Sequence, residues 1–239
     1  MKFKYINKTT IAFLAAVFLS LTYTSKASAS IVTLPTGTNP GDSYRLMFVT
    51  SLTTTASDWG LETSRTRMNS FVTSVANTQA QLVALNTTWN AVWSTPTISA
   101  KDNTGTNESN ASHESVPIYL LDGSTIIAND NADLWDGSVD NFINVTETGS
   151  TLSAWVWTAT DRGSDVFAGY AGMVEFGLTN NTSGYWVERN VRPRSESYHV
   201  YAISDVITVA QVSSPTTFVM MFTVLFGIFV RRRNTCSSN

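Results

Sequence analysis

The sequence predicts a single α+β domain, in which one early amphipathic helix is followed by a mainly antiparallel sheet-and-loop region. An apolar stripe with helical spacing occurs once, between residues 64 and 85. After it, short runs rich in β-branched and aromatic residues alternate with polar turns. The chain has 239 residues and no internal repeat, so one domain over residues 30–211 accounts for everything between two apolar terminal segments.

The helix is predicted from residues that recur every three or four positions, with Thr63 or Ser64 as the N-cap. We expect Met68 and Phe71 to be core residues. The residues of this stripe are Met68, Phe71, Val72, Val75, Gln79, Leu82 and Val83.

Five later or flanking runs have the composition of strands, and Asp122-Gly123 between two apolar runs indicates a tight hairpin. Seven tryptophans are many for this length; we expect several in the core, while exposed ones can stack on sugars. The strand-like runs are 44–51, 89–94, 116–128, 153–160 and 200–209.

The N-terminus has the pattern of a secretory signal peptide over residues 1–29. Three lysines among the first eight residues precede the apolar run Ile11–Leu21. Ala27 and Ala29 then supply the small-x-small pattern of a signal-peptidase site.

The C-terminus ends in a predicted membrane segment over residues 212–234 and a short cytoplasmic tail over residues 235–239. Phe218–Val230 is apolar apart from Thr223 and Gly227 and has no polar face. The basic residues that follow are typical of a stop-transfer signal that stays in the cytoplasm. These residues are Arg231, Arg232 and Arg233.

This tail resembles the PEP-CTERM sorting signals of Gram-negative bacteria, in which an exosortase recognises a short motif and removes the helix. The usual motif is Val-Pro-Glu-Pro, whereas this chain has Val212, Ser213, Ser214 and Pro215 before its apolar run and arginines. The resemblance implies sorting by an exosortase, and a permanent anchor is the alternative.

Charge and cysteine content exclude several classes of protein. Four of the 15 basic residues lie in residues 1–29 and three in Arg231–Arg233, which leaves eight against all 18 acidic residues, a net charge of −10 for residues 30–211. Such a domain lacks the basic footprint of a nucleic-acid-binding protein. Its only cysteine, Cys236, lies in the predicted tail, so no disulfide is expected in the domain.

Three stretches of the central region resemble an uncharacterised extracellular bacterial domain whose fold is related to endostatin and C-type lectins. They are "SAKDNTGTN" (99–107), "PIYLLDGSTIIANDNADLWDGSVDNFINVTETGS" (117–150) and "VWTAT" (156–160), and their order is kept over residues 41–209. The resemblance implies that fold and no particular activity.

An acidic stretch is a candidate calcium site, because calcium takes six to eight oxygen ligands, often from one loop. The EF-hand pattern fails here, and Asp and Asn also form turns by bonding their own backbone, so a purely structural loop is the alternative. No other metal or cofactor is indicated. The four carboxylates are Asp130, Asp133, Asp136 and Asp140.

A carbohydrate-active hydrolase that uses the carboxylates of Asp133 and Asp136 is a second hypothesis, but it lacks a catalytic motif. Neither His113 nor His199 neighbours a nucleophile signature. We therefore predict no catalytic residue and no enzymatic activity.

Three arginines, Arg189, Arg192 and Arg194, stand close together on an otherwise acidic domain. They are candidates for binding an anionic polysaccharide. Local ion pairs with Glu188 and Glu196 are the alternative.

Taken together, the sequence predicts an exported cell-surface or extracellular-matrix protein of a Gram-negative bacterium with a non-catalytic binding or structural role, whose partners are the membrane, an exosortase and extracellular polysaccharide.

Overall fold

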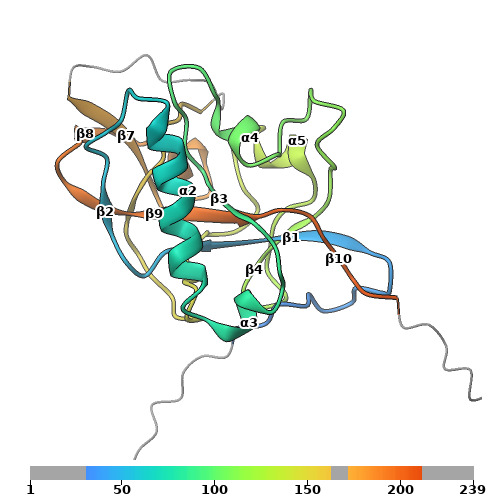
Figure 1. The fold of residues 1–239 in the computed structure, drawn as a ribbon. Coiled ribbons are helices and arrows are strands. Elements are labelled where there is room, and N and C mark those ends of the chain that lie inside the picture. Colours follow the sequence, from blue (N-terminus) through green and yellow to red (C-terminus); the bar gives the residue numbers. More distant parts are fainter. Residues whose placement is uncertain (1–30, 163–171, 212–239) are drawn as a thin grey trace, which may run out of the picture.

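The computed structural model describes residues 31–162 and 172–211, which form a mixed sheet with few helices (Figure 1). The predicted α+β class is confirmed at this level. The strands are β1 (Ser43–Val49), β2 (Thr54–Thr55), β3 (Trp89–Ala91), β4 (Ile118–Leu120), β5 (Ile126–Ala128), β6 (Trp155–Trp157), β7 (Met173–Leu178), β8 (Asn190–Pro193), β9 (Ser197–Ser204) and β10 (Ile207–Thr208).

The sheet has the strand order β5-β4-β1-β9-β6-β7-β8, with β10 paired to β1 and with β2 and β3 paired to β9. Seven of the nine strand pairings among the described residues are antiparallel; β1 with β4 and β6 with β9 are parallel. The mainly antiparallel prediction is thus confirmed. Strand β9 lies at the centre, because it pairs with four other strands.

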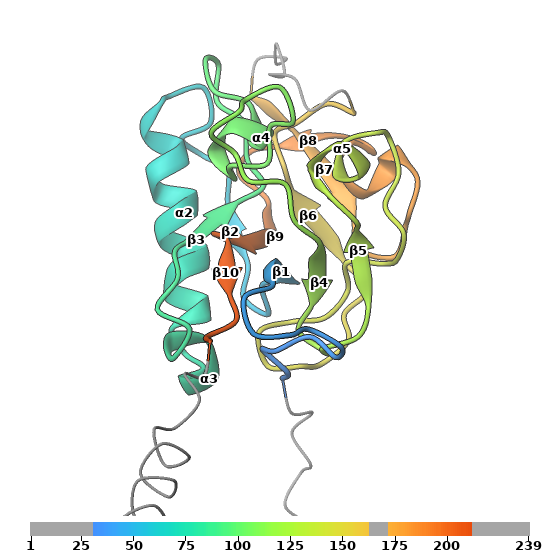
Figure 2. The ribbon, with the colours of Figure 1, turned by 90° about the vertical axis from the view of Figure 1, so that its right-hand side faces the viewer.

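The helical elements are short except for one. Figure 2 shows α2 along one side of the strands and α5 on the other. The side chains between them form a single core that includes the buried rings of Trp89, Trp93, Trp157 and Trp186. The helical elements are α2 (Thr63–Ala76), α3 (Ala80–Val83), α4 (Ala100–Asn103), α5 (Asn131–Leu134) and the 3-10 turn η2 (Gly184–Trp186).

The predicted helix is two helices, which corrects the sequence analysis. α2 ends at Ala76, and Gln79 has an extended backbone, with φ −112° and ψ 116°, before α3 begins. Neither Thr63 nor Ser64 is the N-cap of α2. Glu62 occupies that position, and its side chain forms no capping hydrogen bond. The stripe is nevertheless buried at four positions, whereas Phe71 is only partly buried against the core and Val83 is 52% exposed. The buried positions are Met68, Val72, Val75 and Leu82.

All five strand-like runs contain strands, and the Asp122-Gly123 hairpin joins β4 to β5. Asp122 shapes the turn by accepting hydrogen bonds from the backbone N–H groups of Ser124 and Thr125. Gly123 has φ +74°, a conformation that favours glycine. Strands β2, β7 and β8 were not predicted.

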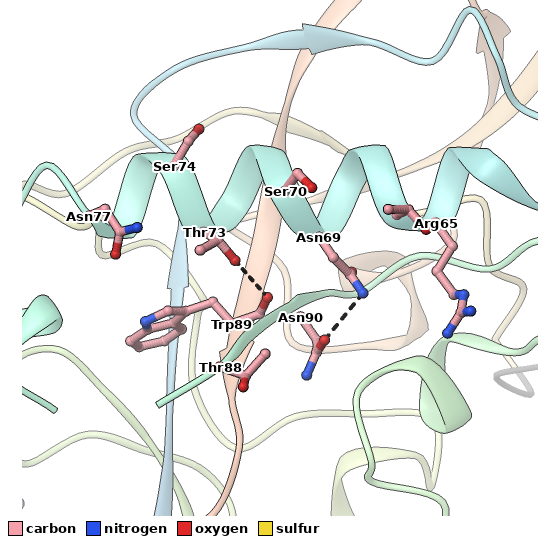
Figure 3. Close-up of a pocket in the computed structure, with 10 residues that line it drawn as sticks. Arg65, Asn69, Ser70, Thr73, Ser74, Asn77, Thr88, Trp89 and Asn90 are labelled. Atoms are coloured by element: carbon pink, nitrogen blue, oxygen red, sulfur yellow. Dashed lines mark hydrogen bonds between the residues drawn. The ribbon is translucent and has the colours of Figure 1, made fainter. Parts of the chain in front are cut away.

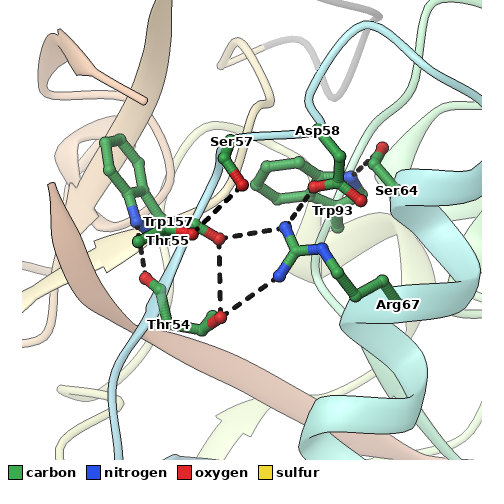
Figure 4. Close-up of polar contacts among 8 residues, drawn as sticks. All are labelled: Thr54, Thr55, Ser57, Asp58, Ser64, Arg67, Trp93 and Trp157. Carbon is green, nitrogen blue, oxygen red and sulfur yellow. Dashed lines mark hydrogen bonds and ion pairs between the residues drawn. The ribbon is translucent and has the colours of Figure 1, made fainter. Parts of the chain in front are cut away.

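Arg67 ties α2 to the sheet (Figure 4). Its guanidinium donates to Thr54 Oγ1 at 3.1 Å and to the Thr55 carbonyl at 2.9 Å, and it pairs with Asp58. The carbonyl oxygen of Thr54 accepts from the indole N–H of Trp157 at 3.1 Å. This network links α2, β2 and β6 through one arginine.

Arg45 on β1 performs a similar role in the interior. It is 4% exposed, and its guanidinium donates to the carbonyl oxygens of Thr104, Gly105 and Ser204 at 2.8–3.1 Å. These bonds connect β1 to the turn after α4 and to the end of β9. Arg45 therefore satisfies three backbone acceptors from two distant segments.

We expect Arg45→Ala to lower the free energy of unfolding by about 3 kcal/mol or more, because it leaves buried carbonyls without donors. Arg194→Ala removes the same charge from an exposed position and should change stability by less than about 0.5 kcal/mol. Urea unfolding followed by tryptophan fluorescence measures both. Equal effects for the two variants would contradict the structural role of Arg45.

Candidate functional site

The most distinctive exposed feature is an aromatic cluster on one face of β6, β7 and β9. Trp155, at the start of β6, is 40% exposed. Its ring lies 5.0 Å from that of Phe176 and 5.4 Å from that of Tyr198, which is nearly perpendicular at 83°. Tyr198 also packs on the buried Trp157, at 4.4 Å between centroids.

Strand register explains why these side chains meet. Trp155 and Trp157 are two residues apart on β6 and so share a face. Trp157 pairs with Phe176 on β7 and with Val200 on β9, which places Tyr198, two residues before Val200, on the same face. The face is therefore built from three strands that are distant in sequence.

Arg192, on the edge strand β8, completes this face. Its guanidinium carbon lies 4.7 Å from the centroid of Trp155 and 5.8 Å from that of Phe176. It forms no ion pair within the described residues, and its Nε is buried without a hydrogen-bond partner. We call Trp155, Phe176, Tyr198 and Arg192 the Trp155 face.

Tyr198 is held in place by a neighbour. Its hydroxyl donates to the carboxylate of Glu196. Burial and this carboxylate together raise the pKa of Tyr198 to about 12, so the phenol stays protonated in the physiological range. Glu196 is thereby engaged with Tyr198.

The structure separates the three arginines that the sequence placed together. Arg189 lies over the ring of Tyr185 at 4.7 Å, and Arg162 lies 4.5 Å from the same ring. Arg194 is exposed. The alternative of local ion pairs with Glu188 and Glu196 is wrong within the described residues, because none of the three arginines forms an ion pair there. Glu188 pairs with Arg162 at 3.3 Å instead, and Glu196 accepts from Tyr198. Only Arg192 belongs to the Trp155 face.

The acidic stretch is folded by its own hydrogen bonds. Asp130 caps α5 by accepting from the Asp133 N–H, and Asp133 accepts from the backbone N–H of Asn129. Asp136 accepts from Ser138, and Asp140 accepts from the Asn129 side chain at 3.1 Å. In the part of the chain that the structure describes, no three His, Cys, Asp or Glu side chains are grouped to hold a metal ion.

The two carboxylates of the hydrolase hypothesis, those of Asp133 and Asp136, are among the groups that form these hydrogen bonds within the stretch. Asp133 is bonded to Asn129 and Asp136 to Ser138. The two histidines also have backbone partners: His113 Nδ1 accepts from the N–H of Asn107, and His199 Nδ1 lies 2.6 Å from the carbonyl of Thr50. No nucleophile is paired with either histidine by a hydrogen bond among the described residues.

A polar groove of about 460 Å³ runs beside α2 and β3 (Figure 3). Its side chains bond mainly to one another: Asn69 donates to Asn90 at 3.2 Å, and Thr73 donates to the Trp89 carbonyl at 3.1 Å. Asn90 in turn donates to Asp205 at 3.1 Å. The groove is open, and the amides of Asn69 and Asn90 are occupied by these bonds, so it is a weaker candidate than the Trp155 face.

Glu175, on the opposite face of β7 from Phe176, is an unusual buried acid. It is 3% exposed, and its Oε2 has no hydrogen-bond partner. Burial raises the pKa of Glu175 to about 8, and the nearby negative charges of Glu188 and Asp161 add to this shift.

Comparison with models of known protein families finds none that matches the chain, and comparison with curated proteins finds no significant match. No helix in residues 31–162 or 172–211 is long and apolar enough to cross a membrane. The predicted signal peptide, with Ala27 and Ala29, and the predicted sorting segment, from Val212 to Arg233, lie outside the described residues.

Trp155 and Tyr198 were not among the predicted site residues. The pattern "WVW" at Trp155–Trp157 could have indicated two rings on one sheet face, since alternate residues of a strand share a face. The partners on β7 and β9 could not be found that way, because they depend on pairings between distant segments.

The two interpretations of the acidic stretch differ in a thermal measurement. We expect Asp130→Ala to cost about 1 kcal/mol in the presence of a chelator, because the α5 cap is lost without any role for calcium. A calcium site would instead raise the melting temperature of the unaltered chain with millimolar calcium, and Asp130→Ala would abolish that rise.

Glu175 should make stability depend on pH. Its pKa is raised in the folded state, so the folded chain binds this proton more tightly than the unfolded chain. As far as this group is concerned, stability is therefore greatest below about pH 4.5, falls as the pH rises from there to about 8, and then levels off. Unfolding curves from pH 5 to 9 should lose this part of the slope in Glu175→Gln; an unchanged slope would contradict the assignment.

Proposed function

We propose that this chain is an exported, non-catalytic carbohydrate-binding protein of a Gram-negative bacterium, at the cell surface or in the extracellular matrix. The observation that supports binding is the Trp155 face, where a half-exposed indole lies on a rigid sheet with its neighbours fixed. The C–H groups of a pyranose ring form an apolar face that packs on an indole ring, while its hydroxyls remain in water or bond to nearby polar groups.

The size of the exposed feature favours a sugar over a protein partner. A stable protein interface buries about 1,200 Å² or more and has an apolar centre. Here Trp155 is the only large exposed apolar side chain of the described residues of β6 to β9. One exposed ring matches one sugar ring, and the acidic domain does not suit nucleic acid.

Export and sorting are part of the proposal and rest on the sequence. Residues 1–29 have the signal-peptide pattern, and residues 212–234 have the apolar run and arginines of a sortable tail. The finer fold assignment, related to endostatin and C-type lectins, is also proposed, on the order of the three resembling stretches between residues 99 and 160.

Cell fractionation with mass spectrometry of the mature C-terminus tests the sorting step. We expect a surface or extracellular form that ends before Arg231, because the exosortase resemblance implies removal of the helix. Retention of all three arginines in every molecule would leave a permanent anchor as the correct interpretation.

Affinity electrophoresis of the full-length chain through gels that contain soluble polysaccharides tests the binding role. We expect retardation by at least one polysaccharide and a loss of affinity of about fivefold or more in Trp155→Ala, because the stacking ring is removed. Phe142→Ala is the matched control, since Phe142 is 47% exposed but lies near β5, at the other end of the sheet. Equal losses in both variants, or no retardation by any polysaccharide, would contradict the proposal.

A further inference from the structure

We infer that the sugar bound at the Trp155 face carries a carboxylate, so that the ligand class is a polysaccharide of hexuronic acid units. This inference rests on the proposed function and concerns the same site. It assigns Arg192 as the residue that recognises the carboxylate, beside Trp155 as the residue on which the ring stacks.

The unpaired state of Arg192 is the first support. Two arginines of the described residues have a carboxylate partner: Arg67 pairs with Asp58, and Arg162 pairs with Glu188. Arg192 has no such partner among the described residues, although acidic residues outnumber basic ones by 18 to eight in residues 30–211. A cation left unpaired on such an acidic domain is available to an anionic ligand.

The stacking geometry is the second support. A guanidinium that lies over aromatic rings uses its face for the cation–π contact and leaves its in-plane N–H groups for a ligand. Two such groups match the two oxygens of a carboxylate in a bidentate pair. Only the Arg192 Nε is buried, and no described residue accepts from the guanidinium, so its outer N–H groups remain available.

The neighbours of Arg192 define the rest of the charge at the site. Glu196 accepts a hydrogen bond from the Tyr198 hydroxyl and forms no ion pair with Arg192. Arg194 lies beyond the end of β8, is exposed, and makes no cation–π contact with the rings of Trp155, Phe176 or Tyr198. Because the domain as a whole carries −10, unspecific adsorption of polyanions is disfavoured, and binding to one would report a built site.

The decisive comparison uses polygalacturonate and its fully methyl-esterified form, which share the ring and differ in the charge of the carboxyl group. The full-length chain should be retarded by the acid at least about tenfold more strongly than by the ester. Arg192→Gln should lose this preference while keeping its weak interaction with the ester. Arg192→Lys keeps the charge without the planar fork and should retain only part of the preference.

Arg194→Gln is the matched control, because it removes an equal charge from a nearby exposed position and should keep the preference for the acid. Thermal unfolding of each variant checks that folding is intact. Equal retardation by acid and ester would overturn the carboxylate inference but leave the carbohydrate-binding proposal standing. Failure to bind the acid at all, or an equal loss of the preference for the acid in Arg194→Gln and Arg192→Gln, would also overturn the role of Arg192. The proposed function would then be decided separately, by whether the chain binds neutral polysaccharides and loses that binding in Trp155→Ala.

Discussion

The pairing of β9 with four other strands is the constraint on which the rest of the structure depends. Buried backbone N–H and C=O groups must be bonded, and β9 has neighbours on both sides over its central residues. At its C-terminal end the Ser204 carbonyl accepts from Arg45, and the Ser204 hydroxyl accepts from the Leu46 N–H. Its N-terminal end carries Tyr198 into the Trp155 face. One strand thus connects the interior of the domain, at its C-terminal end, with the candidate site, at its N-terminal end.

The alternation of side chains on β9 also explains why the candidate site has a rigid base. Tyr201 points to the face opposite Tyr198, is fully buried and lies 5.9 Å from the ring of Trp186. Trp186 belongs to η2, which comes so close to β7 that a Cβ on Gly177 would lie 1.9 Å from its carbonyl oxygen. The back of the sheet at β7 and β9 is therefore closely packed, so the exposed ring of Trp155 and its neighbours on the front rest on a layer that cannot easily shift.

Local patterns predicted most of the elements but not their association. The stripe from Met68 to Leu82 and the Asp122-Gly123 turn were sufficient for α2 and the β4–β5 hairpin, because both depend on neighbouring residues. The break at Gln79 was missed, since the apolar spacing continues across it. The sequence also grouped Arg189 with Arg192, but their partners, Tyr185 and Trp155, come from different segments and separate them. Tertiary pairing, rather than proximity in sequence, decides which arginine meets the exposed indole.

The place of the Trp155 face in the molecule is consistent with a tethered binding protein. Gly41 and Val209 are hydrogen-bonded, so the described chain ends beside the start of β1, at the β1–β10 end of the domain. Figures 1 and 2 both show β8, which carries Arg192, on the side opposite the end of β10. A tether that starts at residue 212 would hold the domain by the β10 end and leave β8 directed outward. Because Phe176 and Arg192 already fix the Trp155 ring, little side-chain entropy is lost when a sugar binds there. A tether at the β10 end would then direct outward a site whose side chains are already in place for binding.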